Sequence, residues 1–106
     1  MARVLCIHKH LVLAGLKSWL EEFGHQVGTT ISTENARDML DQKQYDIVIC
    51  DSEFPDFVEE LLRRPLLNVI VFGDIENKNE GAWYLPLTTV MDELNELIRQ
   101  IHGQLS

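Results

Sequence analysis

Short apolar runs alternate with stretches of helical spacing along the chain, and this alternation strongly limits the folds open to it. Five runs carry the branched and aromatic side chains typical of strands, at residues 3–7, 25–29, 45–50, 68–72 and 83–85. Apolar side chains recur every three or four positions in four other stretches, at residues 11–23, 33–42, 55–62 and 90–105. Such an order, with short loops, predicts an α/β fold: a parallel sheet with helices on both faces.

The charge balance narrows the class of partner. Seventeen acidic residues against nine lysines and arginines give the 106-residue chain a net charge of −8. That charge opposes a phosphate-binding surface, so we expect no direct contact with nucleic acid. No apolar run approaches the roughly 20 residues that cross a bilayer, and the first residues lack the pattern of a secretory signal. Two cysteines, Cys6 and Cys50, are typical of buried thiols in a reducing compartment. We expect a cytoplasmic, single-domain protein (1–106) that does not contact membranes.

The connection between the fourth and fifth expected strands is too short for its usual helix. Only residues 73–82 (GDIENKNEGA) separate the two strands. A parallel crossover usually needs a dozen or more residues, most of them helical. Ile75 is the only large apolar side chain in the segment, so no stripe would hold a helix on the sheet. We expect this helix to be absent or vestigial. The edge of the sheet then either recruits a partner or is covered by Trp83, Tyr84 or the last helix.

The most specific pattern lies in residues 45–55. An apolar run, YDIVIC, is followed by Asp51, and Pro55 comes four residues later. Together with RVLCIHKH, NVIVFGD and a Leu-Pro pair before the last helix, this pattern resembles the receiver domain of response regulators over nearly the whole chain. The resemblance implies a flavodoxin-like three-layer sandwich whose five parallel strands lie in the order 2-1-3-4-5. It also places Asp51 where receivers accept a phosphoryl group.

Four other positions of the receiver site carry unsuitable residues. The two acids that hold a cation in receivers align with His8 and Lys9, and the hydroxyl residue after the fourth strand aligns with Gly73. The lysine that precedes a proline near the fifth strand aligns with Leu85. Phosphoryl transfer to a carboxylate needs a hard cation held by oxygen ligands, and the Lys9 ammonium would repel that cation. The chain therefore resembles a degenerate receiver, often called a pseudo-receiver.

Asp51 has two possible roles in such a site without a metal. Lys9 and Asp51 both follow neighbouring strands, so the ammonium could replace the metal and pair with the carboxylate. Alternatively, Asp51 only starts a turn, for which Ser52 and the following proline are typical residues. A genuine phospho-acceptor, phosphorylated by a histidine kinase, would need acidic ligands from elsewhere, and Glu53 or Asp74 are the available donors.

A metal centre made of softer ligands is disfavoured. Cys6, His8 and His10 alternate along the first expected strand and its end, and Cys50 lies on another strand. Zinc uses these residue types, but the spacing matches no zinc motif. We expect no metal, no cofactor and no enzymatic activity. His25 falls near a helix terminus, where a surface histidine is the ordinary interpretation.

The expected function is that of a regulatory interaction module which works without phosphorylation, in bacterial signal transduction or transcription regulation. Its partner is another protein or an effector domain, and a homodimer through a non-standard face is possible. Receivers often pair through their fourth helix, fifth strand and fifth helix, and the missing helix alters that surface. Trp83, Tyr84 and Leu87 are the candidate interface, since Trp and Tyr are enriched in interface cores. The first helix is the alternative interface.

Overall fold

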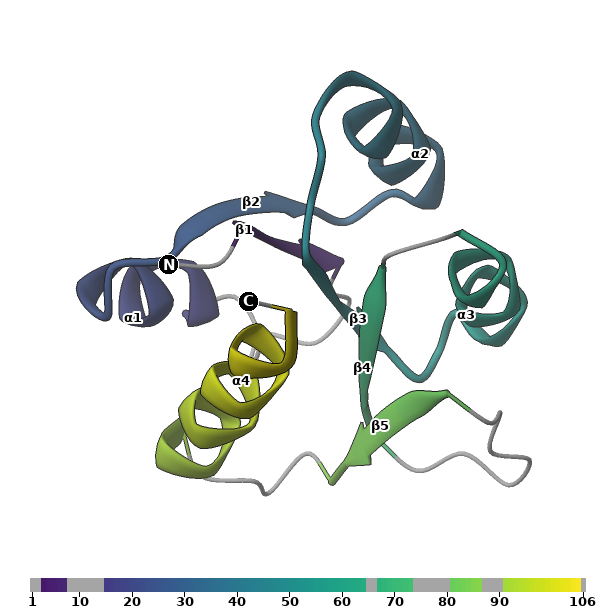
Figure 1. Ribbon diagram of the computed structural model, residues 1–106. Helices are drawn as coiled ribbons and strands as arrows, with labels where there is room; N and C mark the ends of the chain where they lie inside the picture. The colour runs from purple at the N-terminus through teal and green to yellow at the C-terminus, as the bar shows by residue number, and fades with distance from the viewer. Residues whose placement is uncertain (1–2, 8–14, 65–66, 74–80, 87–90, 106) are drawn as a thin grey trace.

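A computed structural model describes residues 3–7, 15–64, 67–73, 81–86 and 91–105 of the chain. The elements are β1 (Arg3–Ile7), α1 (Leu16–Glu22), β2 (Gln26–Thr30), α2 (Thr33–Gln42), β3 (Ile47–Asp51), α3 (Pro55–Leu62), β4 (Asn68–Phe72), β5 (Ala82–Leu85) and α4 (Met91–Leu105). The strands form one parallel sheet in the order β2-β1-β3-β4-β5, which confirms the predicted class and strand order. Figure 1 shows α1 and α4 on one side of this sheet and α2 and α3 on the other.

Each face of the sheet has its own apolar core. The side chains of a strand alternate between the two faces, and β1 shows this plainly. Val4 and Cys6 pack with α1 and α4, whereas Leu5 and Ile7 pack with α2 and α3. Central strand β3 is buried at all of its positions, as its continuous apolar sequence predicted. Burial on both faces gives the expected three-layer sandwich.

Asp46 fixes the amino-terminal edge of the sheet. Its carboxylate accepts the backbone N–H of Arg3 at 3.0 Å, and its own N–H donates to the Arg3 carbonyl at 2.9 Å. The Asp46 carbonyl accepts the N–H of Asn68 at 3.1 Å. These bonds join the starts of β1 and β4 to the residue before β3. The third strand begins at Ile47, so the predicted start at Tyr45 was two residues early.

The loops on either side of β2 contain a helix cap and a buried histidine. Ser32 caps α2, since its hydroxyl accepts the N–H of Asn35 at 3.3 Å. His25, predicted to lie at the surface, is instead buried. Gly24 takes a positive φ of +89° directly after α1, and the His25 N–H donates to the Leu20 carbonyl at 3.2 Å. This turn folds the chain back against the sheet and buries the imidazole.

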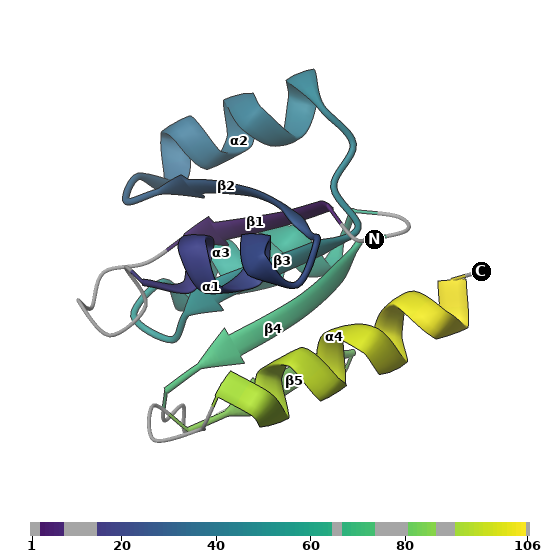
Figure 2. The same ribbon diagram turned by 90° about the vertical axis from the view of Figure 1, so that its left-hand side faces the viewer.

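β5 follows β4 with no helix among the described residues between them, as the short connection predicted. Figure 2 shows α4 lying over β4 and β5 on one face. Leu94, Ile98 and Ile101 of α4 are buried against that face. Within the described part of the chain, no helix has the length and apolar character needed to cross a membrane.

Candidate functional site

Asp51 ends the central strand at the carboxyl edge of the sheet. It lies opposite Phe72 of β4, and its side chain is 0% exposed. Ser52 and Gly73 are the next residues along these two neighbouring strands, so they meet at the same edge. In parallel sheets, ligand sites usually gather at this edge. The structure therefore brings three of the residues singled out by sequence to one place: Asp51, Ser52 and Gly73.

The Asp51 carboxylate holds the turn into α3. Its Oδ1 accepts the N–H of Glu53 at 3.0 Å, and the Asp51 carbonyl accepts the N–H of Phe54 at 3.2 Å. A side-chain bond to the N–H two residues on is the pattern of an Asx turn. Pro55 then occupies the first turn of α3, where its fixed φ suits the helix and its missing N–H costs nothing. The turn predicted from Asp51, Ser52 and Pro55 is present.

Ser52 occupies the space in which a side chain at position 73 would lie. Gly73 has a φ of +117°, and a Cβ built on it would overlap the Ser52 hydroxyl oxygen. Backbone bonds fix both residues: the Ser52 N–H donates to the Phe72 carbonyl and the Gly73 N–H to the Leu85 carbonyl, each at 2.8 Å. From the sequence alone, position 73 is known only to be a glycine that follows an apolar run. The structure adds that a hydroxyl from Ser52 stands against this glycine, beside Asp51.

Of the other residues that the sequence singled out for this site, the structure describes Leu85 but not His8, Lys9 or Asp74. Leu85 ends β5 and packs half-buried into the core beneath α1 and α4, so it presents an apolar side chain. His8, Lys9 and Asp74 lie outside the described residues, and the Lys9–Asp51 contact stays a prediction. No group of three or more His, Cys, Asp or Glu side chains within the described ranges is placed to hold a metal ion.

The two cysteines lie on opposite faces of the sheet. Cys6 belongs to the core under α1 and α4, and Cys50 to the core under α2 and α3, so they cannot share a metal ion. Burial raises the pKa of the Cys6 thiol to about 12. Burial, with a smaller contribution from the negative charge of Asp51, raises the pKa of Cys50 to about 12 as well. Both thiols are therefore protonated at neutral pH, which disfavours them as nucleophiles.

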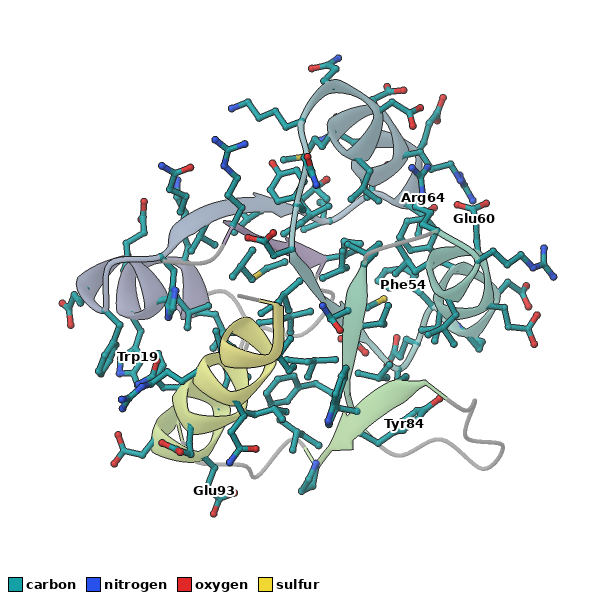
Figure 3. The ribbon with its side chains drawn as sticks, in the orientation of Figure 1. Trp19, Phe54, Glu60, Arg64, Tyr84 and Glu93 are labelled. Carbon is teal, nitrogen blue, oxygen red and sulfur yellow. The ribbon has the colours of Figure 1, made fainter. Side chains whose placement is uncertain are left out.

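The aromatic residues of the candidate interface lie on β5, an edge strand of the sheet. Trp83 packs against the core beneath α1 and α4, and Tyr84 packs against the opposite core; both are half-buried. Figure 3 shows Tyr84 extending from β5 on the side away from α4. Leu87 lies outside the described residues. The two aromatic residues therefore belong to different faces and do not form one continuous patch.

Solved structures resemble this fold along the whole chain. The receiver domain of the response regulator TorR matches with a TM-score of 0.85 at 18% identity, covering 100% of both chains. The receiver domain of the Francisella response regulator 1452 matches with a TM-score of 0.84 at 17% identity, again over 100% of both chains. A chain in the complex of histidine kinase ThkA with response regulator TrrA matches at 0.79 and 23% identity, over 95% of this chain and 98% of that one.

The likeness to these structures establishes the fold. No family model matches the chain, and neither does any curated protein. The chain has the fold of response-regulator receiver domains, as the sequence pattern indicated.

Proposed function

We propose that this chain is a pseudo-receiver, a regulatory module that binds a protein partner without being phosphorylated. The observation that carries the proposal is that Asp51 is completely buried and that its carboxylate accepts a hydrogen bond within the turn into α3. Its side chain is 0% exposed, and Oδ1 accepts the Glu53 N–H at 3.0 Å. A phosphoryl donor must reach a carboxylate oxygen in line with its leaving group, and a buried oxygen does not allow that approach.

The residues around Asp51 support the same proposal. Transfer to a carboxylate also needs a cation that offsets the charge of the phosphoryl oxygens. The sequence provides His8 and Lys9 after the first strand, where receivers carry two acids. Glu53 is exposed, and its backbone N–H donates to the Asp51 carboxylate. These features favour a structural carboxylate over a phospho-acceptor.

Labelling with a small phosphoryl donor separates the two functions. We expect the chain, incubated with acetyl phosphate and Mg²⁺, to gain no phosphoryl mass in intact-protein mass spectrometry. A competent receiver treated in parallel shows that the reagents work. An added phosphoryl mass that disappears in Asp51→Asn would contradict the proposal and establish the alternative, a phospho-acceptor that serves a histidine kinase.

The surface of β5 away from α4 is the proposed docking face. Tyr84 projects from an edge strand there, and α2 and α3 supply the helices packed on this face within the described part of the chain (Figure 3). Aromatic side chains that are half-buried in the free protein can bury further area against a partner. A second copy of the chain, a protein partner or an effector domain could occupy it. TrrA, to whose fold this one is similar, is found in complex with a histidine kinase.

Self-association through this face gives a direct test. We expect sedimentation velocity to show a concentration-dependent dimer that Tyr84→Glu weakens, because each interface would then bury two carboxylates. Phe23→Glu is the matched control, since Phe23 is an aromatic residue 49% exposed near the alternative interface on α1. If Phe23→Glu abolishes the dimer and Tyr84→Glu does not, the interface lies at α1 and not at β5. A wild type that stays monomeric would rule out self-association through this face. The partner would then have to be a different protein.

A further inference from the structure

A cavity of about 310 Å³ opens at the amino-terminal edge of the sheet, the edge opposite Asp51. Its lining includes Arg3 and Gln26, the first residues of β1 and β2. Met39 of α2 also lines it, as do Lys43 and Tyr45 from the segment that follows this helix. The cavity lies beside the edge strand β2, and its volume is at the lower limit for sites that enclose small organic ligands.

The cavity combines an apolar floor with a cationic rim. Gly28, Met39 and Tyr45 are half-buried and form the floor. A Cβ at Gly28 would come within 2.8 Å of the Tyr45 hydroxyl and 2.9 Å of the Met39 methyl. The glycine therefore lets the tyrosine and the thioether lie close over β2. An aromatic ring and a thioether are both favourable neighbours for the face or edge of another aromatic ring.

The rim carries two cationic side chains that form no ion pair with the described residues. Arg3 and Lys43 are exposed, and neither makes an ion pair within the described part of the chain. The nearby Asp46 carboxylate bonds to the backbone N–H of Arg3. Acidic residues outnumber lysines and arginines nearly two to one in this chain, whose net charge is −8. Two cationic side chains without a paired carboxylate at one cavity are therefore unusual.

A neighbouring hollow lacks this combination. It shares Lys43 and Tyr45 with the cavity, and its additional cation is Arg64. The Arg64 guanidinium already donates to the Asp41 carboxylate at 3.3 Å. An incoming anion would have to displace that carboxylate, so the side lined by Arg3 is the better site for negative charge.

We propose that the cavity beside β2 binds a small aromatic carboxylate. The ring would lie on the floor made by Gly28, Met39 and Tyr45, and the carboxylate would lie at the rim between Arg3 and Lys43. Charge-assisted hydrogen bonds to these cations would fix its orientation. The proposal goes beyond the proposed function, because the site lies at the opposite edge of the sheet from Asp51 and needs neither phosphorylation nor the β5 face.

The test uses 2-naphthoate as the probe and neutral 2-naphthamide as its uncharged counterpart. Amide NMR titrations at low ionic strength follow the chemical shifts of the whole chain. We expect saturable shifts from 2-naphthoate centred on Gly28, Lys43 and Tyr45, and binding of the amide that is about three- to tenfold weaker. Lys43→Gln and Arg3→Gln should each weaken naphthoate binding by a similar factor.

Lys17→Gln is the matched control. Lys17 is also exposed and makes no ion pair with the described residues, but it lies on α1, away from the cavity. The Lys17→Gln substitution removes the same unit of charge as Lys43→Gln. It should leave naphthoate binding unchanged. Equal weakening by Lys17→Gln and Lys43→Gln would overturn the site, because net charge alone would then explain binding. Equal affinity for naphthamide and naphthoate, or shifts absent from Gly28, would overturn it as well.

Discussion

Replacing Gly73 with threonine, the kind of residue that receivers carry there, is expected to lower the free energy of unfolding by roughly 2 to 6 kcal/mol. Two costs add. A β-branched residue at φ +117° is strained by about 1–3 kcal/mol. The new Cβ also overlaps the Ser52 hydroxyl oxygen, and overpacking of that kind costs a further 1–3 kcal/mol or so. Urea denaturation of the two proteins measures the difference.

Two variants separate these costs. In Ser52→Gly/Gly73→Thr the overlap disappears and the backbone strain remains, so we expect part of the lost stability to return. Gly15→Thr is the matched control, because Gly15 has a φ of −84° and no atom within 4 Å of its Cβ position. It should change stability by no more than about 0.5 kcal/mol. A Gly73→Thr protein as stable as the wild type would show that the edge of the sheet is looser than described.

Alkaline pH should destabilise the protein through its two buried thiols. Burial raises the pKa values of Cys6 and Cys50 from the ordinary 9.0 to about 12. Above pH 9 the unfolded chain releases these protons while the folded chain keeps them, so the free energy of unfolding falls as pH rises. The loss reaches about 1.4 kcal/mol per pH unit for each thiol and about 2 kcal/mol for each by pH 10.5. Below pH 8 the thiols contribute no pH dependence.

Comparison with Cys6→Ala/Cys50→Ala isolates this effect from lysine and tyrosine titration. The double variant has smaller side chains in both cores, which lowers its stability at every pH but does not create a slope. We expect the wild type to lose roughly 4 kcal/mol more than the double variant between pH 8 and 10.5. Each single variant should show about half of the difference. Parallel curves for all four proteins would mean that the thiols are more accessible to water than their burial indicates.

Most of the fold could be predicted because buried strands and helices leave characteristic patterns of apolar residues in the sequence. Strands such as β3 and β4 are buried on both faces, so their apolar runs are continuous, and the short glycine-containing connection before β5 cannot carry an apolar stripe. The strand order came from the receiver resemblance, since periodicity does not rank strands in a sheet. Boundaries were less accurate: β3 begins at Ile47, two residues after the predicted start at Tyr45.

The candidate site was predicted in part. Asp51 at a strand end and its turn were expected from a strand pattern followed by turn residues. The packing of Ser52 against Gly73 was not, because it depends on the sign of a backbone angle that glycine leaves open. The burial of His25 was missed for a similar reason: the positive φ of Gly24 sets the direction of the turn. The cavity beside β2 depends on residues far apart in sequence, from Arg3 to Tyr45, with no local pattern to join them.

The central claim is that the edge of the sheet at Asp51 no longer responds to a phosphoryl group. Beryllofluoride mimics that group at receiver aspartates, so amide NMR with Mg²⁺, with and without beryllofluoride, tests the claim at the residue concerned. We predict that the amides of Asp51 and Gly73 keep their chemical shifts in both titrations while the rest of the spectrum remains that of a folded protein. Saturable, magnesium-dependent shifts centred on Asp51 would contradict the claim and show that the phosphorylation site still works.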